Sequence, residues 1–125
     1  MTLRSFHADF AWVVVLTNAV VGLWALGAHY DDRFRSRWLW ISTIVAEATA
    51  MAEVGLGVAL VAIQHHQVNG FHALYGFSAF ATVGIVYSYR AQMKSRQHLL
   101  YGLGGLFLMG LAIRAMTVTP FPPKP

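Results

Sequence analysis

Cysteine is absent from this chain of 125 residues, and charged residues make up only 11% of it. The first absence excludes disulfides, thiolate catalysis and cysteine metal sites. The charged fraction is well below the roughly 25% that soluble domains carry. Hydrophobic residues reach 57%, and a globule of this size has too little interior to bury them all in water. The composition therefore predicts an integral membrane protein.

Long polar stretches are missing as well. Mostly apolar stretches predict four helices, at 8–29, 38–65, 71–90 and 98–118. Each is close to the ~20 residues that cross ~30 Å of hydrocarbon, and none alternates as a barrel strand would. The first is longer than the apolar core of a usual signal peptide, so we expect it to span the membrane. We predict an all-α, four-helix transmembrane bundle as a single domain over 1–125, ending in an extended, proline-rich tail at 119–125.

The connections between the predicted helices are short and polar, which favours an up-down-up-down topology. Six basic residues lie in the first and third connections, and three lie on the opposite side. The positive-inside rule then places both termini outside the cytoplasm of a cell membrane. Segments 21–37 and 83–96 each run from a Val-Gly pair to a basic-Ser-Arg triplet. This indicates two repeated helical hairpins or, equally, a chance match of loop chemistry.

Two carboxylates lie inside the second predicted helix. A charge at mid-membrane costs several kcal/mol unless it is paired, hydrated or protonated, so Glu47 and Glu53 are candidates for a proton relay or cation site. Six residues apart, they point ~120° from each other and need not share one site. Asn18, in the first helix, needs hydrogen-bond partners, and we expect Glu47 or Glu53 to supply one. The alternative for all three is an interhelical hydrogen bond that only binds helices together.

The six histidines gather near the predicted membrane surfaces. His72 opens the third helix and could pair with His65 or His66 on the outer side, and His29 could pair with His98 on the inner side. Two histidines from different helices at one depth can hold a b-type haem. No Glu-x-x-His motif and no histidines four residues apart are present, so no metal is assigned. The alternative is that each histidine is an interface residue.

Other residues are explained by the membrane itself. We expect Arg114 to extend to the headgroups, and Asp9 lies closer to it in depth than Glu53 does. Aromatic residues near both surfaces are typical of an interfacial belt, although they could also line a quinone site. Small residues in the second and fourth helices indicate faces where helices pack closely, including against other subunits.

The chain contains no nucleophile elbow, phosphate loop or dinucleotide fingerprint, so we expect no independent catalytic activity. The leading interpretation is a small subunit of a larger membrane assembly, such as a respiratory or electron-transfer complex, with a haem b or quinone site. The alternatives are an oligomeric transporter or channel that uses Glu for proton or cation coupling, and an independent haem-binding electron carrier. Expected partners are membrane lipids and other subunits or copies of the chain. Nucleic acid is not expected, because the basic residues cluster between apolar runs.

Overall fold

The computed structural model describes residues 2–118, and these fold into four long helices with two short 3₁₀ turns. The elements are α1 (Leu3–Tyr30), η1 (Asp32–Phe34), α2 (Arg37–Ala62), α3 (Gly70–Ser88), η2 (Lys94–Arg96) and α4 (Gln97–Thr117). All four long helices have the length and apolarity needed to span a membrane. The prediction of an all-α chain with four such helices is confirmed. The tail predicted at 119–125 lies outside the described residues.

Local capping explains where the helix ends differ from the predicted ones. α1 begins at Leu3 rather than at 8, because Thr2 and Ser5 form a reciprocal capping box. The Ser5 N–H donates to Thr2 Oγ1 at 3.1 Å, and the Thr2 N–H donates to Ser5 Oγ at 3.0 Å. α2 ends at Ala62 rather than at 65, and His65 beyond it has a φ of 56°. The longer α1 brings residues 3–7 into the helical bundle.

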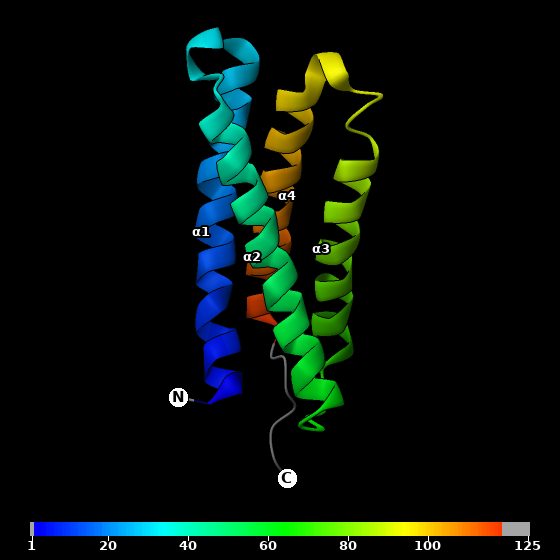
Figure 1. The fold of residues 1–125 in the computed structure, drawn as a ribbon. Helices are drawn as coiled ribbons and strands as arrows, with labels where there is room; N and C mark the ends of the chain where they lie inside the picture. Colours follow the sequence, from blue (N-terminus) through cyan, green and yellow to red (C-terminus); the bar gives the residue numbers. More distant parts are fainter. Residues whose placement is uncertain (1, 119–125) are drawn as a thin grey trace.

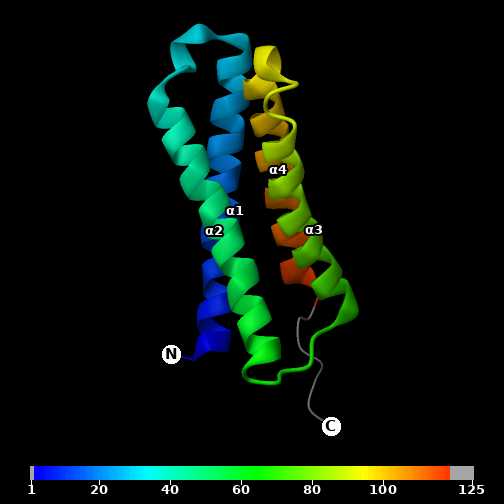
Figure 2. The same ribbon diagram turned by 45° about the vertical axis from the view of Figure 1, so that its right-hand side comes forward.

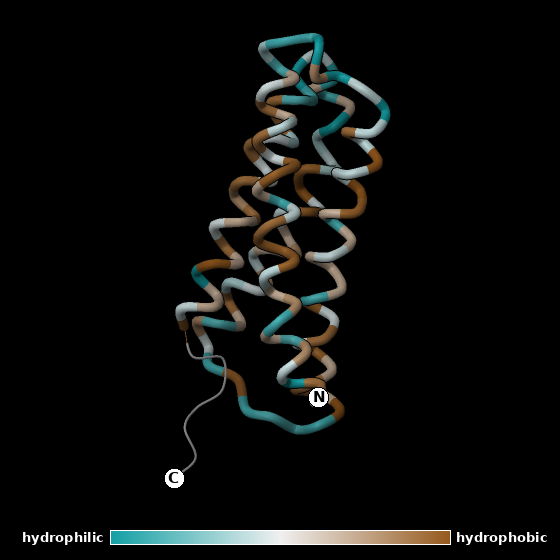
Figure 3. The backbone as a smooth tube through the Cα atoms, turned by 90° about the vertical axis from the view of Figure 1, so that its left-hand side faces the viewer, coloured by the Kyte–Doolittle hydropathy of each residue, from teal (hydrophilic) through white to brown (hydrophobic). Residues whose placement is uncertain are grey.

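The connections separate into two ends of the bundle (Figures 1 and 2). The α1–α2 and α3–α4 connections lie at what we call the upper end, and the α2–α3 connection lies at the lower end, near the N-terminus. Hydrophilic residues are concentrated in these connections (Figure 3). α1 packs most extensively against α4 and then against α2, whereas α3 packs mainly against α4 and touches α2 only lightly.

The faces that α1 and α2 turn toward each other repeat with alternating steps of four and three residues. On α1 these positions are His7, Ala11, Val14, Asn18, Val21, Ala25 and Ala28, all buried. On α2 they are Leu39, Thr43, Ala46, Ala50, Glu53, Gly57 and Leu60, all buried or half-buried. This is the heptad spacing of a helix pair that packs knobs into holes. We call it the α1–α2 seam.

Two contacts define the antiparallel register of the seam. The His7 ring lies against Gly57, and the Asn18 side-chain amide donates to the Ala46 carbonyl at 3.3 Å. Moving eleven residues along α1 from the first contact to the second therefore moves eleven residues back along α2. Polar residues at seam positions favour one register, because slippage would leave their polar atoms without partners in an apolar interior.

Asn18 is satisfied by the main chain and not by a carboxylate as expected. Its side-chain amide donates to the carbonyls of Val14, at 2.9 Å, and Ala46, at 3.3 Å. The Ala46 carbonyl also accepts from Thr49 Oγ1 at 2.6 Å, and the Thr49 and Thr17 hydroxyl oxygens lie 3.3 Å apart. This polar layer joins the middle of α1 to α2, which matches the alternative of an interhelical hydrogen bond between helices.

Glycines bring α1 and α4 into very close contact. A Cβ on Gly22 would lie 3.0 Å from the Leu106 nitrogen, and one on Gly105 would lie 3.1 Å from the Gly22 Cα. A Cβ on Gly102 would lie 2.7 Å from Leu26 Cγ and 2.9 Å from the Leu26 nitrogen. Only glycine fits where two backbones approach this closely, which is the packing that small residues permit between membrane helices.

Large apolar side chains point mainly outward from the bundle. Leu16, Val20, Ile44 and Phe77 are 59–68% exposed, whereas most positions along the α1–α2 seam are small or polar. In water this arrangement would leave much apolar surface unburied. Such an exterior is compatible with a multi-pass membrane protein.

Gly102→Ala should destabilise the bundle by about 1–3 kcal/mol, because the new methyl group meets the α1 backbone, which cannot move aside locally. Gly110→Ala is the matched control on the same helix, since nothing lies within 4 Å of its Cβ position. The control should be neutral, or more stable by up to about 1 kcal/mol from helix propensity. Unfolding in mixed detergent, followed by circular dichroism, measures both. Equal effects of the two variants would contradict the α1–α4 contact.

Candidate functional site

A histidine and a carboxylate meet in the lower half of the α1–α2 seam. His7 Nδ1 lies 2.9 Å from Glu53 Oε1, and the two side chains are only 11% and 14% exposed. Neither of these two atoms has a well-aligned hydrogen-bond partner among the described residues. The two atoms therefore contact each other closely, and neither is hydrogen-bonded to the surrounding main chain.

Gly57 leaves the space that the His7 ring occupies. It lies one turn after Glu53 on α2, and a Cβ there would lie 3.2 Å from His7 Cε1 and 3.6 Å from His7 Nε2. Glu53 and Gly57 thus hold one edge of the imidazole together, the first through Nδ1 and the second through the adjoining carbon. The seam register determines this arrangement, because both residues occupy seam positions of α2.

His72 brings the other two helices to the same place. It lies near the start of α3, and its ring is perpendicular to that of His7, with 6.2 Å between ring centroids. Its Nδ1 lies 2.8 Å from the carbonyl oxygen of Ala115 on α4. His7, Glu53 and His72, with the Ala115 carbonyl, therefore form one cluster drawn from all four helices, which we call the lower cluster.

Arg114 lies at the rim of the lower end. Its Nε donates to the Tyr75 hydroxyl at 3.1 Å and its Nη1 to Thr117 Oγ1 at 3.4 Å, and its guanidinium lies 5.7 Å from the centre of the Tyr75 ring. No carboxylate pairs with it in the described part of the chain. Its exposed position fits the expected extension toward headgroups.

The other sequence candidates are distributed over both ends of the bundle. His65 and His66 belong to the α2–α3 connection, where His65 is exposed and His66 is half-buried. His29 lies at the end of α1, with its ring against Tyr30. His98, at the start of α4, lies within electrostatic range of His29, so the structure brings this expected pair to one end. Glu47 lies within electrostatic range of Tyr101 of α4.

His7 is the residue that the sequence analysis did not include among the site candidates. The predicted first helix began at 8, which left His7 outside the membrane-spanning segment. Its spacing from Ala11, Val14 and Asn18 continues the seam repeat, and this was the available signal. The ring that contacts His72 is that of His7, and the sequence had favoured His65 or His66 as the partner.

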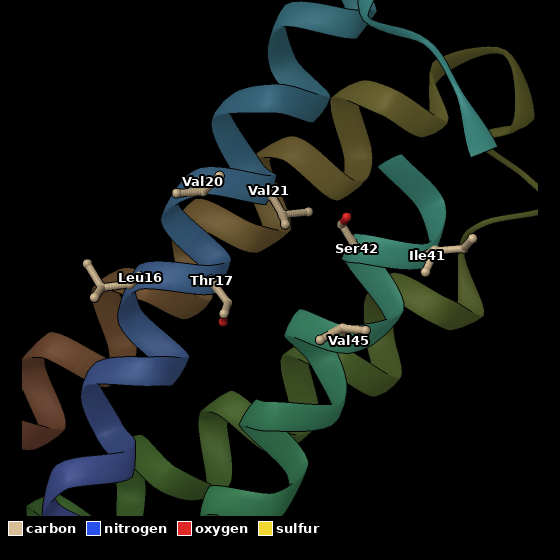
Figure 4. Close-up of a pocket in the computed structure, with 7 residues that line it drawn as sticks. All are labelled: Leu16, Thr17, Val20, Val21, Ile41, Ser42 and Val45. Carbon is tan, nitrogen blue, oxygen red and sulfur yellow. The ribbon is translucent and has the colours of Figure 1, made fainter. Parts of the chain in front are cut away.

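Among the described residues, the lower cluster is neither a metal cage nor part of the two apolar grooves given below. No three His, Asp or Glu side chains among the described residues are grouped so that they could hold a metal ion. An apolar groove of about 420 Å³ lies between α1 and α2 (Figure 4), and one of about 560 Å³ lies between α3 and α4. Both grooves are lined by residues outside the cluster and open toward the surroundings.

Compared with protein-family models, curated protein sequences and solved structures, the chain shows no match in any of the three. Arguments about function therefore depend on the geometry of the chain itself.

Gly57→Ala should displace the His7 imidazole, because the added methyl group would lie 3.2 Å from Cε1. The ¹⁵N chemical shifts of the His7 ring should change, since the Nδ1 contact with Glu53 would lengthen. Gly55→Ala, on the same helix with nothing within 4 Å of its Cβ position, should leave these shifts unaltered. Identical His7 spectra for the two variants would show that Gly57 does not position the ring.

Proposed function

We propose that all four helices cross a lipid bilayer in alternating directions, with the upper end in the cytoplasm and both termini on the other side. The outward-facing large apolar side chains support insertion. The upper end contains six basic residues, five in the two connections and one at the start of α2: Arg33, Arg35, Arg90, Lys94, Arg96 and Arg37. Arg33 pairs with Asp31 and lowers the pKa of that carboxyl, but acidic residues weigh little in the positive-inside rule.

Within this topology, we propose that the protein exchanges protons at the lower cluster and couples this exchange to transport through the membrane. The observation that carries the proposal is the buried His7–Glu53 pair at 2.9 Å. Ionisable groups inside a membrane are costly, and they persist mainly where they are paired or take part in proton or ion movement.

The pair can move a proton without creating net charge. A proton that passes from Glu53 Oε1 to His7 Nδ1 turns a neutral pair into an ion pair, and the total charge stays at zero. A further proton taken up from the aqueous side leaves the pair with one positive charge, and loss of the shared proton leaves one negative charge. His72, whose ring lies beside that of His7, is the next group able to accept or release a proton.

Glu53→Gln should reduce proton movement across proteoliposomes by an order of magnitude or more, because an amide cannot accept the proton of His7. An internal pH dye after an imposed potential measures the flux. Asp9→Asn is the matched control, since it removes an exposed carboxylate from the same end. Flux equal to that of empty vesicles in the wild type, or unaltered flux in Glu53→Gln, would refute the proposal.

A second candidate function is electron transfer with a b-type haem, and one specific observation favours it. His7 and His72 each have Nδ1 occupied, by Glu53 and by the Ala115 carbonyl, so the Nε2 of each ring is left to act as a ligand. Axial histidines in metal proteins are oriented in this way by the partner of the other ring nitrogen. His7 and His72 would supply the two axial ligands, and the haem would supply reversible one-electron chemistry.

The visible spectrum of the protein, purified from cells supplied with haem, tests this candidate. We expect a Soret band that His72→Ala abolishes and that His65→Ala, a change in the exposed α2–α3 connection, leaves intact. A colourless wild-type protein would refute the haem candidate. The proton-exchange proposal is tested separately by the flux measurement. The same haem site would suit a small subunit of an electron-transfer complex, as the sequence predicts. Other subunits of that complex would then donate and accept the electrons.

A further inference from the structure

A second cluster of polar and aromatic side chains lies at the upper end, away from the lower cluster. Trp40 of α2 contacts two rings of α4, with centroid distances of 4.9 Å to His98 and 5.4 Å to Tyr101. The planes of Trp40 and Tyr101 are nearly perpendicular, and those of Trp40 and His98 are tilted by 41°. The backbones of α2 and α4 barely touch, so these rings bridge the space between them.

Three polar groups in this cluster have no hydrogen-bond partner. His98 Nε2 is buried without one. The Tyr101 hydroxyl and the Glu47 carboxylate likewise make no hydrogen bond within residues 2–118, although the two lie within electrostatic range of each other. Hydrocarbon cannot satisfy such groups, and each unpaired one costs free energy. The polar groups of Glu47 on α2 and of His98 and Tyr101 on α4 could therefore be satisfied by a ligand that contains both hydrogen-bond donors and acceptors.

The chemistry of the cluster limits what this molecule can be. It must be soluble in lipid, because the four residues belong to apolar spans. A flat ring suits the aromatic surfaces, and oxygen atoms suit the Tyr101 hydroxyl and the His98 ring nitrogen. Aromatic surfaces with a few convergent polar groups are the usual lining of a small-molecule site. Trp40 lies within one turn of the start of α2, which is the depth of a membrane-surface head group.

We propose that Trp40, His98, Tyr101 and Glu47 bind the head group of a quinone or quinol. The ring lies along Trp40, and the Tyr101 hydroxyl and the His98 Nε2–H donate to the carbonyl oxygens of the oxidised form. In the reduced form, the Glu47 carboxylate accepts from a hydroxyl group. The inference concerns binding alone and does not depend on the lower cluster, which lies at the other end of the bundle.

Titration of the protein in phosphatidylcholine nanodiscs with a short-chain ubiquinone tests the site. We expect the quenching of tryptophan fluorescence to contain a saturable component from binding at the site. Trp40→Phe should remove this component. It should be retained in Trp12→Phe, because Trp12 is 56% exposed on α1. Quenching that rises linearly with quinone in the wild type shows partition into lipid only, and it would overturn the proposal.

Hydrogen bonding is tested separately from ring contact. Tyr101→Phe keeps the aromatic contact with Trp40 and should weaken binding by about threefold to tenfold, the effect of losing one hydrogen bond. Tyr75→Phe is the matched control, because Tyr75 contacts Arg114 at the lower end, away from Tyr101. Unaltered affinity in both Tyr101→Phe and His98→Gln, with native circular dichroism, would reject the assigned donors. Infrared spectra of ¹³C-carbonyl quinone should show a downshifted band only in the wild type and the control.

Discussion

Gly22 and Gly102 allow the backbones of α1 and α4 to approach so closely that a methyl group at Gly102 would collide with Leu26. α1 meets α2 on its other side through the seam, so it contributes to the two most extensive helix interfaces among the described residues. In lipid, association of helices depends on such packing and on a few hydrogen bonds, since apolar side chains gain little by leaving the acyl chains. His7 and Asn18 both lie on α1, so packing of α1 against α4 and α2 determines where their side chains lie.

The two polar layers of the seam have different chemistry. Asn18 has its amide satisfied by main-chain carbonyls at mid-bundle, and this layer works as a structural joint. His7 and Glu53 meet only each other, and His72 reaches them from α3. The seam therefore combines a hydrogen-bonded joint with a His–Glu contact about three turns of α1 away.

The two ends of the bundle suit different ligands. The lower cluster is built from imidazoles and a carboxylate that are nearly buried, with no groove leading to it among those described. Such a site fits a proton, or a ligand that coordinates to ring nitrogens. The cluster of Trp40, His98, Tyr101 and Glu47 at the upper end contains three aromatic rings and polar groups without hydrogen-bond partners. We therefore proposed a flat molecule with oxygen atoms as its ligand. If both sites function, proton exchange and quinone binding occur near opposite ends of the same bundle.

Composition and hydrophobic runs were sufficient to predict four helices, because spanning length and apolarity are properties of local sequence. The polar residues Glu47, Glu53 and Asn18 could also be identified, since their position inside apolar runs is visible in the local sequence. Their partners could not. A capping box between Thr2 and Ser5 lengthened α1 and brought His7 into the bundle, and the antiparallel register placed it opposite Gly57, one turn from Glu53. The sequence by itself determined which residues would need partners, whereas only the tertiary structure decided which residues met, because a pairing depends on helix register and tilt.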